Sequence, residues 1–401
     1  MDIENKLKSM IREVFDKNRM EGFNKKAGKH YFYHCPSRKY YPFQWLWDSA
    51  FHAIINLYIN PEHSLREIKT LLSTQFNDGL IPHMAYWIKL PSFDFLNRIL
   101  LHYYKDPYRS RITQPPVITY AVKKIKDLLG EEYVRDLILP LEKYFEYLSV
   151  NRDFYDENLP NIIHSWESGL DNLPVYDPIN KMLRIVRAYS KVDWNLEMIK
   201  KLDLFTVRDT LFISVYAEGL KILYELTGKK IWEERYKATI NSLIELAWDD
   251  KKKIFVMLYS SGKRLPEVKT VEIFAPLILD IPKDIVESLI NEHLLNKNEF
   301  WLNYPIPTVA ADEKTFNPHV KGRLAYWRGP TWISTNWIVF RGLIKHGYMD
   351  IAREIAEKSI ELVLKNGLRE YYDPINGKGG GASDFGWSGL VIDMLSELKK
   401  I

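Results

Sequence analysis

Residues 209–226, with the sequence DTLFISVYAEGLKILYEL, are apolar on almost every side when they are placed on a helix. A helix of this kind is typical of a buried position. The helix expected next is different, because its apolar side chains form one stripe on an otherwise charged surface, and these are Trp232, Tyr236, Ile240, Leu243 and Ala247. The two segments therefore predict a buried helix that packs against a half-exposed one.

The same alternation recurs along the chain. Residues 336–344 are nearly all apolar, Gly347 interrupts the pattern, and residues 350–364 return as an amphipathic helix rich in Glu and Lys. Helices are also expected over residues 1–20, 48–57, 64–76, 117–129 and 132–148. Buried and half-exposed helices in alternation are what an inner ring wrapped by an outer ring requires. We predict an all-α toroid; an open solenoid is the alternative, but no short repeat supports it.

Three long segments between the helices, residues 77–116, 151–208 and 296–330, are expected to be loops. Loops of that length in a compact domain are usually functional. Every candidate motif falls in one of them or at a helix start beside one, so we expect these loops to form the active-site cleft.

Composition narrows the function classes. The 401 residues carry a formal net charge of +4 without a long basic block, which makes nucleic acid and anionic membranes poor partners. Cys35 is the only cysteine, which excludes intrachain disulfides and a thiolate metal cluster. The first helix is unlike a signal peptide, and no apolar run is long enough to span a bilayer. We expect a single domain over residues 1–401, located in the cytoplasm, which could form a homo-oligomer.

The first candidate motif is YPFQWLWD, residues 41–48. Tyr41, Phe43, Trp45 and Trp47 alternate, which on an extended segment places four rings on one face that could stack on a sugar. Asp48 follows directly and could accept hydrogen bonds from sugar hydroxyls. The alternative is that the rings belong to the core and that Asp48 only caps the next helix.

The second motif is WESGLDN, residues 166–172. Gly169 allows the tight turn needed to push the Asp171 carboxyl into a cleft, where Trp166 could shield it. Burial against an apolar ring raises a carboxyl pKa and keeps the group protonated as a general acid. The alternative is an Asx turn formed by Asp171 and Asn172.

The third motif follows Arg369, where Glu370 lies among aromatic rings and a glycine run comes after it. A phosphate loop would need Lys followed by Ser or Thr after the last glycine, but Lys378 precedes the run. The glycines therefore indicate a backbone that turns so that Glu370 can face a cleft.

A further segment, YWRGPTW at residues 326–332, predicts that a helix begins at Pro330. His83 and Gln114 are weaker candidates, which could contact sugar hydroxyls or belong to the loop structure.

Together these motifs resemble glycoside hydrolase family 63, in the branch of small enzymes that includes mannosylglycerate and glucosylglycerate hydrolases. The resemblance runs from about Tyr41 to the C-terminus and rests on the order YPFQWLWD, WESGLDN, YWRGPTW, then EYYDP with its glycines and FGWS. It implies an (α/α)6 barrel that hydrolyses an α-glycosidic bond with inversion. No zinc pattern such as HExxH occurs and inverting hydrolysis needs no cofactor, so we predict neither a cofactor nor a catalytic metal and leave a structural cation open. Asp171 would be the general acid and Glu370 the general base.

The resemblance also implies which residues hold the substrate. These are Tyr41, Phe43, Trp45, Trp47, Asp48, Gln114, Trp166, Gly169, Tyr326, Trp327 and Trp332, with His83 toward the aglycone and Arg208 less surely aligned. An inverting pair needs its carboxyls roughly 6.5–9.5 Å apart, so that a water fits between the base and the anomeric carbon. Asp171 is expected in drier surroundings than Glu370, because only the acid must stay protonated.

The substrate expected from the resemblance is mannosylglycerate or glucosylglycerate. Several cations near the motifs would suit an anionic aglycone, namely Lys89, Arg208, Arg328 and Arg369. A neutral α-disaccharide, as for a trehalase, is an alternative substrate. A sugar epimerase with paired histidines, drawn from His52, His83, His164 and His319, and a non-catalytic sugar-binding protein are alternative functions on the same toroid.

Overall fold

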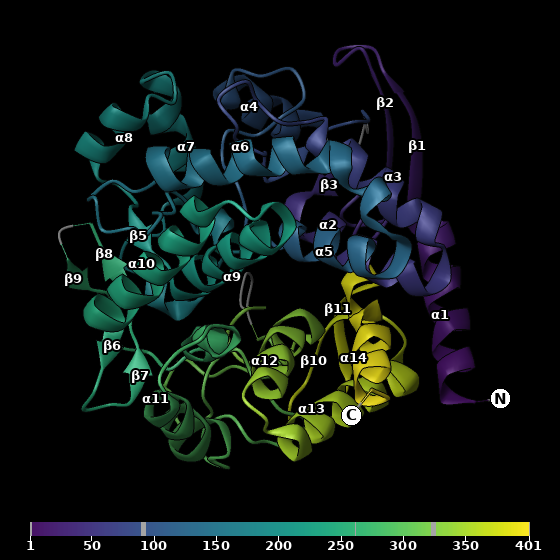
Figure 1. Cartoon of the computed structure of the whole chain (residues 1–401), viewed down its shortest axis with the longest axis vertical. Helices are drawn as coiled ribbons and strands as arrows, with labels where there is room; N and C mark the ends of the chain where they lie inside the picture. Colours follow the sequence, from purple (N-terminus) through teal and green to yellow (C-terminus); the bar gives the residue numbers. More distant parts are fainter. Residues whose placement is uncertain (1, 90–93, 261, 322–325, 401) are drawn as a thin grey trace.

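The helices form a closed ring of pairs, seen end-on in Figure 1, in a computed structural model that describes residues 2–89, 94–260, 262–321 and 326–400. Within these ranges six segments make the inner wall: α2 (Leu46–Ile59), α5 (Ile118–Leu129), α9 (Thr210–Thr227), the 3₁₀ segment η5 (Val271–Ile278), α12 (Ile333–Lys345) and α14 (Val391–Leu398). Each packs against the next, and α14 with the preceding η7 (Gly386–Leu390) packs back onto α2. The fold is an (α/α)6 toroid, which confirms the predicted fold class.

A second set of helices covers the outside of this ring. It comprises α1 (Ile3–Asn18), α3 (Pro61–Leu72), α6 (Arg135–Asn151), α10 (Lys230–Ala247), α11 (Lys283–Ser288) with the π-helical η6 (Leu289–Leu294), and α13 (Met349–Asn366). Consecutive outer and inner helices alternate along the chain, as the hydrophobic patterns predicted. The predicted ends differ from the observed ones by a few residues, which is the usual uncertainty at frayed helix termini.

The pair α9 and α10 explains the contrast that the sequence shows. α9 begins where Asp209 Oδ1 accepts a hydrogen bond from the Phe212 amide at 2.7 Å, and ends at Gly228, which has a φ of +69°. Almost the whole circumference of α9 is buried, because it has neighbours on both sides in the inner wall and α10 behind it. α10 buries only one stripe, from Trp232 to Ala247, and leaves the charged remainder in solvent.

Two of the three segments expected to be loops contain helices, so that prediction is wrong for residues 77–116 and 151–208. The first contains α4 (Asp94–Tyr104), and the second contains α7 (Met182–Lys191) and α8 (Leu196–Leu202). α4 packs on α7, and the Trp194 indole donates to the Tyr103 carbonyl oxygen at 2.8 Å. The three helices are 11, 10 and 7 residues long, so their apolar stripes are short and easily missed in a sequence.

The small sheets are antiparallel, and two of them lie beside the candidate site. The strand β3 (Gln44–Trp45) pairs with β4 (Met84–Ala85), and β10 (Arg369–Tyr372) pairs with β11 (Gly379–Ser383). β1 (Arg19–Asn24) and β2 (Lys29–His34) form a hairpin that projects at the upper right of Figure 1. On the other side, β5 (Val207–Arg208) pairs with β8 (Leu258–Tyr259), which pairs with β9 (Lys263–Arg264), and β6 (Trp248–Asp249) pairs with β7 (Ile254–Phe255).

A buried polar cluster ties the last inner helix to the first ones. Asp393 of α14 forms an ion pair with Lys124 of α5, and accepts hydrogen bonds from the Tyr58 hydroxyl of α2 at 2.6 Å and the Trp337 indole of α12 at 2.7 Å. Glu397 also pairs with Lys124 at 2.9 Å. Since Asp393 is fully buried, these partners compensate for its lost hydration while they hold the ring closed.

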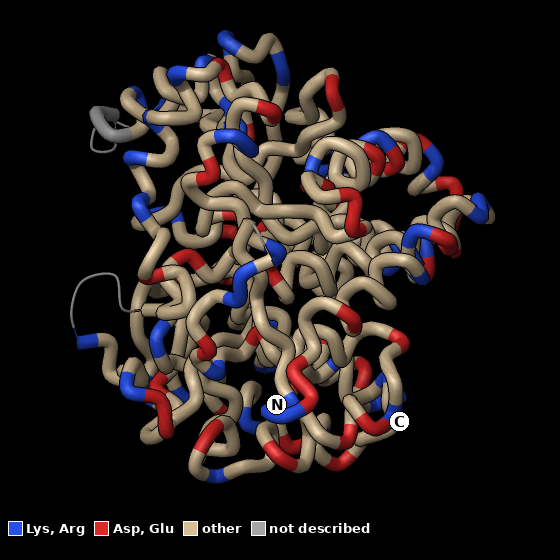
Figure 2. The backbone as a smooth tube through the Cα atoms, turned by 90° about the vertical axis from the view of Figure 1, so that its left-hand side faces the viewer, with Lys and Arg blue, Asp and Glu red and all other residues tan. Residues whose placement is uncertain are grey.

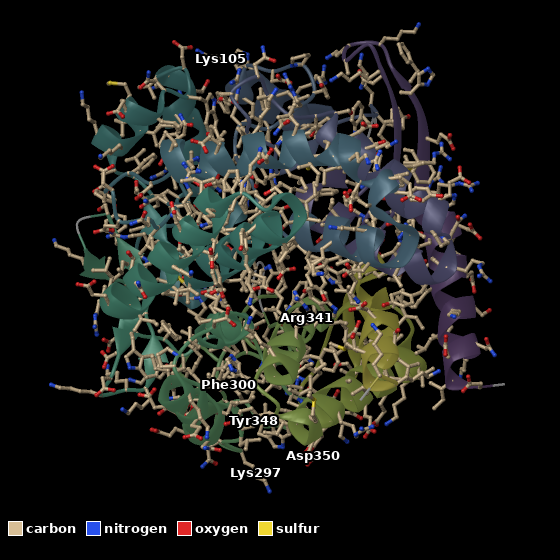
Figure 3. All side chains as sticks on the ribbon, in the orientation of Figure 1. Lys105, Lys297, Phe300, Arg341, Tyr348 and Asp350 are labelled. Carbon is tan, nitrogen blue, oxygen red and sulfur yellow. The ribbon has the colours of Figure 1, made fainter. Side chains whose placement is uncertain are left out.

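Side chains fill the space inside the ring (Figure 3). Arg341 of α12, labelled near the middle of that view, places its guanidinium 3.2 Å from the ring centre of Tyr120 on α5. Its Nη2 lies 3.7 Å from the carboxylate of Glu218 on α9. The inside of the toroid is therefore a packed core rather than a channel.

Charged residues of both signs are interspersed over the surface (Figure 2). None of the helices in the described ranges combines the length and the apolar character needed to cross a membrane.

Candidate active site

A cavity of about 90 Å³ lies where α2 and α12 begin. Many of the candidate residues line it: Tyr41, Trp45, Trp47, Asp48, Gln114, Gly169, Asp171, Tyr326, Trp327, Trp332 and Glu370, together with Pro36, Phe385 and Trp387. Residues separated by more than 300 positions thus meet in one site. The toroid brings them together because the segments before its inner helices all face the same end of the ring.

Glu370 lies on β10 and is 7% exposed. Its carboxyl accepts hydrogen bonds from the Tyr41 hydroxyl at 2.9 Å and from the Ala382 amide at 2.7 Å. Burial raises the pKa of Glu370, while these two donors act in the opposite direction by stabilising the ionised form. The carboxylate is thus held in one orientation by β11 on one side and by Tyr41 on the other.

Gly381 explains why glycine follows Glu370 in the hairpin. Its φ is +63°, and a Cβ atom there would lie 2.4 Å from Glu370 Oε2. A side chain at this position would therefore displace the carboxyl as well as strain the backbone. The register of β10 and β11 also shifts between Arg369 and Tyr371, which turns Glu370 toward the cavity.

Asp171 approaches the same cavity from the segment that follows η3 (Ser165–Glu167). Gly169 makes the turn with a φ of +77°, and a Cβ atom there would lie 2.6 Å from the Trp47 ring. The surrounding protein raises the pKa of Asp171 to about 7, mainly by desolvating the carboxyl, and the Tyr326 hydroxyl opposes this only from 3.4 Å. Near neutral pH a large share of Asp171 is therefore protonated.

Asp171 and Glu370 differ in their hydrogen bonds more than in their burial. The Asp171 side chain is half-buried at the cavity and Glu370 is almost fully covered, while desolvation is the largest cause of the raised pKa of both carboxyls. The drier surroundings expected of Asp171 stay a prediction. Glu370 accepts two short hydrogen bonds that favour its ionised form, whereas Asp171 accepts one long one, so desolvation is opposed less at Asp171.

Asp48 is a third carboxyl in the cavity, in the first turn of α2. It is 4% exposed, and burial raises its pKa well above the ordinary range, with a further contribution from the charges of Asp171 and Glu370. A protonated Asp48 offers one donor and one acceptor to a hydroxyl-bearing ligand.

Aromatic rings form the walls of the cavity. Trp327 and Trp332 stack with their ring centres 3.6 Å apart, and Trp387 lies 5.6 Å from Trp332. Trp47 contacts Trp387 edge-on at 5.5 Å. Flat apolar walls with polar groups between them suit a sugar ring, which has apolar faces and a polar rim.

The prediction that four alternating rings share one face is wrong. The extended segment ends at Trp45 because α2 begins at Leu46, so Trp47 projects from a helix. Phe43 turns the other way and packs against Tyr86, with ring centres 5.0 Å apart, where it lines a separate groove.

Three other candidates are not among the described residues that line the cavity. His83 is buried, bonds Ser110 Oγ through Nδ1 at 3.0 Å and stacks on Trp166 with ring centres 6.0 Å apart. Arg208 pairs with Glu157 and is 3% exposed. His83 and Trp166 thus contact each other instead of the cavity, and Arg208 is occupied by an ion pair.

The sequence reasoning missed the ion pair that anchors the Asp171 segment. Arg152, at the end of α6, donates to both oxygens of Glu167, at 2.6 and 2.9 Å, and both residues are almost fully buried. Glu167 also accepts hydrogen bonds from the backbone amides of Ile163 at 2.6 Å and Thr113 at 2.8 Å. One carboxylate thus joins the segment before Gln114 to the segment before Asp171. No local pattern could reveal this pairing, since Arg152 and Glu167 lie 15 residues apart with irregular structure between them, and Thr113 is 54 residues from Glu167.

Among the described residues, no three or more His, Cys, Asp or Glu side chains are placed so that they could hold a metal ion together.

The toroid and the aromatic cavity with its facing carboxyls are those of a glycoside hydrolase. Comparison with protein families specifies this further: residues 41–388 match the model of the mannosylglycerate hydrolase MGH1-like glycoside hydrolase domain. The chain belongs to this family, as the four motifs predicted.

Similar proteins agree with this assignment. The chain is 28% identical to mannosylglycerate hydrolase from Thermus thermophilus, over 89% of this chain and 94% of the other. It is 24% identical to glucosylglycerate hydrolase from Mycolicibacterium hassiacum, over 88% of this chain and 91% of the other. The crystal structure of the family 63 mannosylglycerate hydrolase from Thermus thermophilus with Tris and D-glycerate matches with a TM-score of 0.85 and 26% identity, covering 97% of this chain and 100% of that one.

Proposed function

We propose that this enzyme hydrolyses the α-glycosidic bond of a small glycoside of an organic acid, such as mannosylglycerate or glucosylglycerate, with inversion of the anomeric configuration. The observation that carries the proposal is the pair Asp171 and Glu370, which line one cavity and differ in their hydrogen bonds: Glu370 accepts two short ones that favour its ionised form, whereas Asp171 accepts one long one. Relatives named for both substrates support the substrate class.

In this mechanism Asp171 donates its proton to the glycosidic oxygen as the bond to the aglycone breaks. Glu370, ionised and held by Tyr41 and Ala382, removes a proton from a water that attacks the anomeric carbon from the opposite face. Two carboxyls and one water balance the reaction, so the proposal needs no cofactor. Direct attack by water also predicts the wider carboxyl spacing of inverting enzymes.

Substrate positioning falls to the residues that line the cavity. Trp327 and Trp332 provide an apolar wall for a sugar face, and Asp48 and Gln114 provide polar groups for its hydroxyls. Gln114 is itself held near the start of α2, where its side-chain oxygen accepts a hydrogen bond from the Trp47 amide at 3.3 Å.

For the whole chain we further propose a single domain over residues 1–401, a cytoplasmic location and the capacity to form a homo-oligomer.

The epimerase alternative is less well supported by the positions of the histidines. His52 and His164 are fully buried, and His83 bonds Ser110, whereas the cavity is lined by carboxyls. A neutral α-disaccharide remains an alternative substrate that an assay must separate.

The test is a substrate panel of mannosylglycerate, glucosylglycerate and neutral α-disaccharides, with the anomer of the released sugar followed by NMR. We expect hydrolysis of an acid glycoside, with the β-anomer appearing first. Glu370→Gln and Asp171→Asn should each lower kcat by at least about 10³-fold, while the glycoside still binds. Near-normal turnover in Glu370→Gln, or first release of the α-anomer, would refute the assignment.

A further inference from the structure

A second groove, of about 540 Å³, lies beside the catalytic cavity but is lined by different residues. It runs between the turn of the β1–β2 hairpin, the chain after β4, and α4. Its size is within the range of sites that hold drug-sized ligands. Nothing in the proposed glycosidase mechanism uses it.

The floor of this groove is built from aromatic residues with fixed positions. Phe43 and Tyr86 pack together, and the Trp87 indole donates to Gln44 Oε1 at 2.6 Å. Asn24 of the hairpin donates to the Trp87 carbonyl oxygen at 2.7 Å. These contacts tie the hairpin to the floor, so the groove is a formed feature of the fold.

The rim of the groove is positively charged. Lys25 and Lys26 come from the hairpin turn, and Lys89 comes from the opposite side; all three are exposed. Within the described ranges none of the three has an ion-pair partner, and no Asp or Glu lines the groove. Like charges placed around one concave surface raise the local concentration of anions.

We propose that this groove binds a small phosphate monoester, with its ring against the aromatic floor and its phosphate between the lysines. A phosphate monoester carries about −1.5 to −2 charges at neutral pH, so it can engage more than one ammonium group. A sugar or a nucleobase offers a face that stacks on rings such as Phe23, which is 51% exposed at the edge of the groove. Sugar phosphates and nucleotides share this chemistry.

The groove and the catalytic cavity are separate sites that share a wall. Phe43 lines the groove, Trp45 lines the cavity, and their ring centres are 6.1 Å apart. The proposal therefore goes beyond the glycosidase function and does not depend on it.

Isothermal titration calorimetry with glucose 6-phosphate, AMP and inorganic phosphate tests the proposal. The titrations are made with the full chain in excess glucose, so that any sugar site in the catalytic cavity is already filled. We expect at least one monoester to bind with a Kd below about 1 mM and more tightly than inorganic phosphate. Tighter binding of glucose 6-phosphate would assign the groove to sugar phosphates, and tighter binding of AMP would assign it to nucleotides.

Two variants and a matched control decide whether binding occurs in this groove. Lys25→Gln/Lys26→Gln/Lys89→Gln should weaken the monoester at least about tenfold. The control Lys6→Gln/Lys230→Gln/Lys251→Gln removes the same charge from exposed lysines outside the groove and should bind as the wild type does.

Phe23→Ser should weaken the monoester but not inorganic phosphate, because only the ester has a ring to stack. The proposal is overturned if no monoester binds below about 10 mM. It is also overturned if the triple variant binds like its control, or if inorganic phosphate binds as tightly as both esters.

Discussion

Removal of the Arg152 side chain tests whether the buried ion pair anchors the Asp171 segment. Arg152→Met keeps an unbranched apolar stem of similar length but leaves Glu167 without its two guanidinium hydrogen bonds. The Glu167 carboxylate would stay fully buried with only the Thr113 and Ile163 amides as donors. Breaking one partner of such a pair typically costs about 3–5 kcal/mol.

That cost converts into a melting shift through the size of the chain. At about 2.1 cal/mol/K per residue, the 401 residues give an unfolding entropy near 0.8 kcal/mol/K, so Tm should fall by about 4–6 °C. Because the anchor acts through the position of Asp171, kcat should fall by about tenfold or more while KM changes less. Scanning calorimetry and steady-state kinetics on the preferred glycoside measure both effects.

The double variant Arg152→Met/Glu167→Gln provides the decisive comparison. Because the double variant leaves no buried charge, it should lose less free energy of unfolding than the sum of the two single variants, by about 2 kcal/mol or more. Arg235→Met is the control, because Arg235 pairs with Glu146 at 2.6 Å on the surface, and it should shift Tm by about 1 °C. Additive single effects, or an equal loss in Arg235→Met, would refute the anchoring role.

Three further predictions concern the carboxyls of the cavity. kcat/KM should fall above pH about 7, where Asp171 loses its proton, and should also fall in acid, where Glu370 takes up a proton. A value of kcat/KM that still rises at pH 9 would contradict these roles. Gly381→Ala should lower kcat by about 10²-fold, because the added Cβ meets the Glu370 carboxyl. The control Gly228→Ala has a φ of +69° and open space around the added Cβ, so it should lose only stability. An equal kcat in the two variants would count against the contact with Glu370. Asp171→Asn should raise the free energy of unfolding at pH 8 by about 2–3 kcal/mol, or Tm by about 3 °C. The reason is that the folded-state pKa of Asp171 is raised to about 7, so ionisation of this carboxyl costs stability as the pH rises from about 4 to 7. Below pH about 4 the two proteins should melt together, and a gain that persists there would contradict the link to ionisation.

The ring of paired helices could be predicted because it leaves a local signature. A residue on α9 has neighbours on every side and one on α10 has them on a single stripe, so the hydrophobic period alone separates the two classes. The inner segment η5 was not predicted, since its eight residues contain Glu272 and Pro276 among apolar ones and fold as a 3₁₀ helix. The helices α4, α7 and α8 were not predicted, because they are short and lie within segments that are otherwise polar.

The carboxyls and the tryptophans of the cavity could be named from motifs, but their geometry could not. Trp47 leaves the face of the alternating segment because α2 begins at Leu46, and Phe43, which precedes β3, packs against Tyr86, which follows β4. The partners of Glu370 come from Tyr41 and from Ala382, one more than 300 residues away and one across a bulged hairpin. Such contacts arise from closure of the toroid, which no single segment encodes.

The raised pKa values also explain how a cavity with three carboxyls could accept an acid glycoside. If Asp48, Asp171 and Glu370 were all ionised, each would repel the substrate carboxylate by about 1–4 kcal/mol at a separation near 4 Å. Burial keeps Asp48 protonated and Asp171 largely so near neutral pH, while two hydrogen bonds favour an ionised Glu370. The cavity then carries close to one negative charge, and this charge belongs to the group that the proposed mechanism needs as a base. In the proposed mechanism, the desolvation that keeps Asp171 protonated thus also lowers the electrostatic barrier to an anionic substrate.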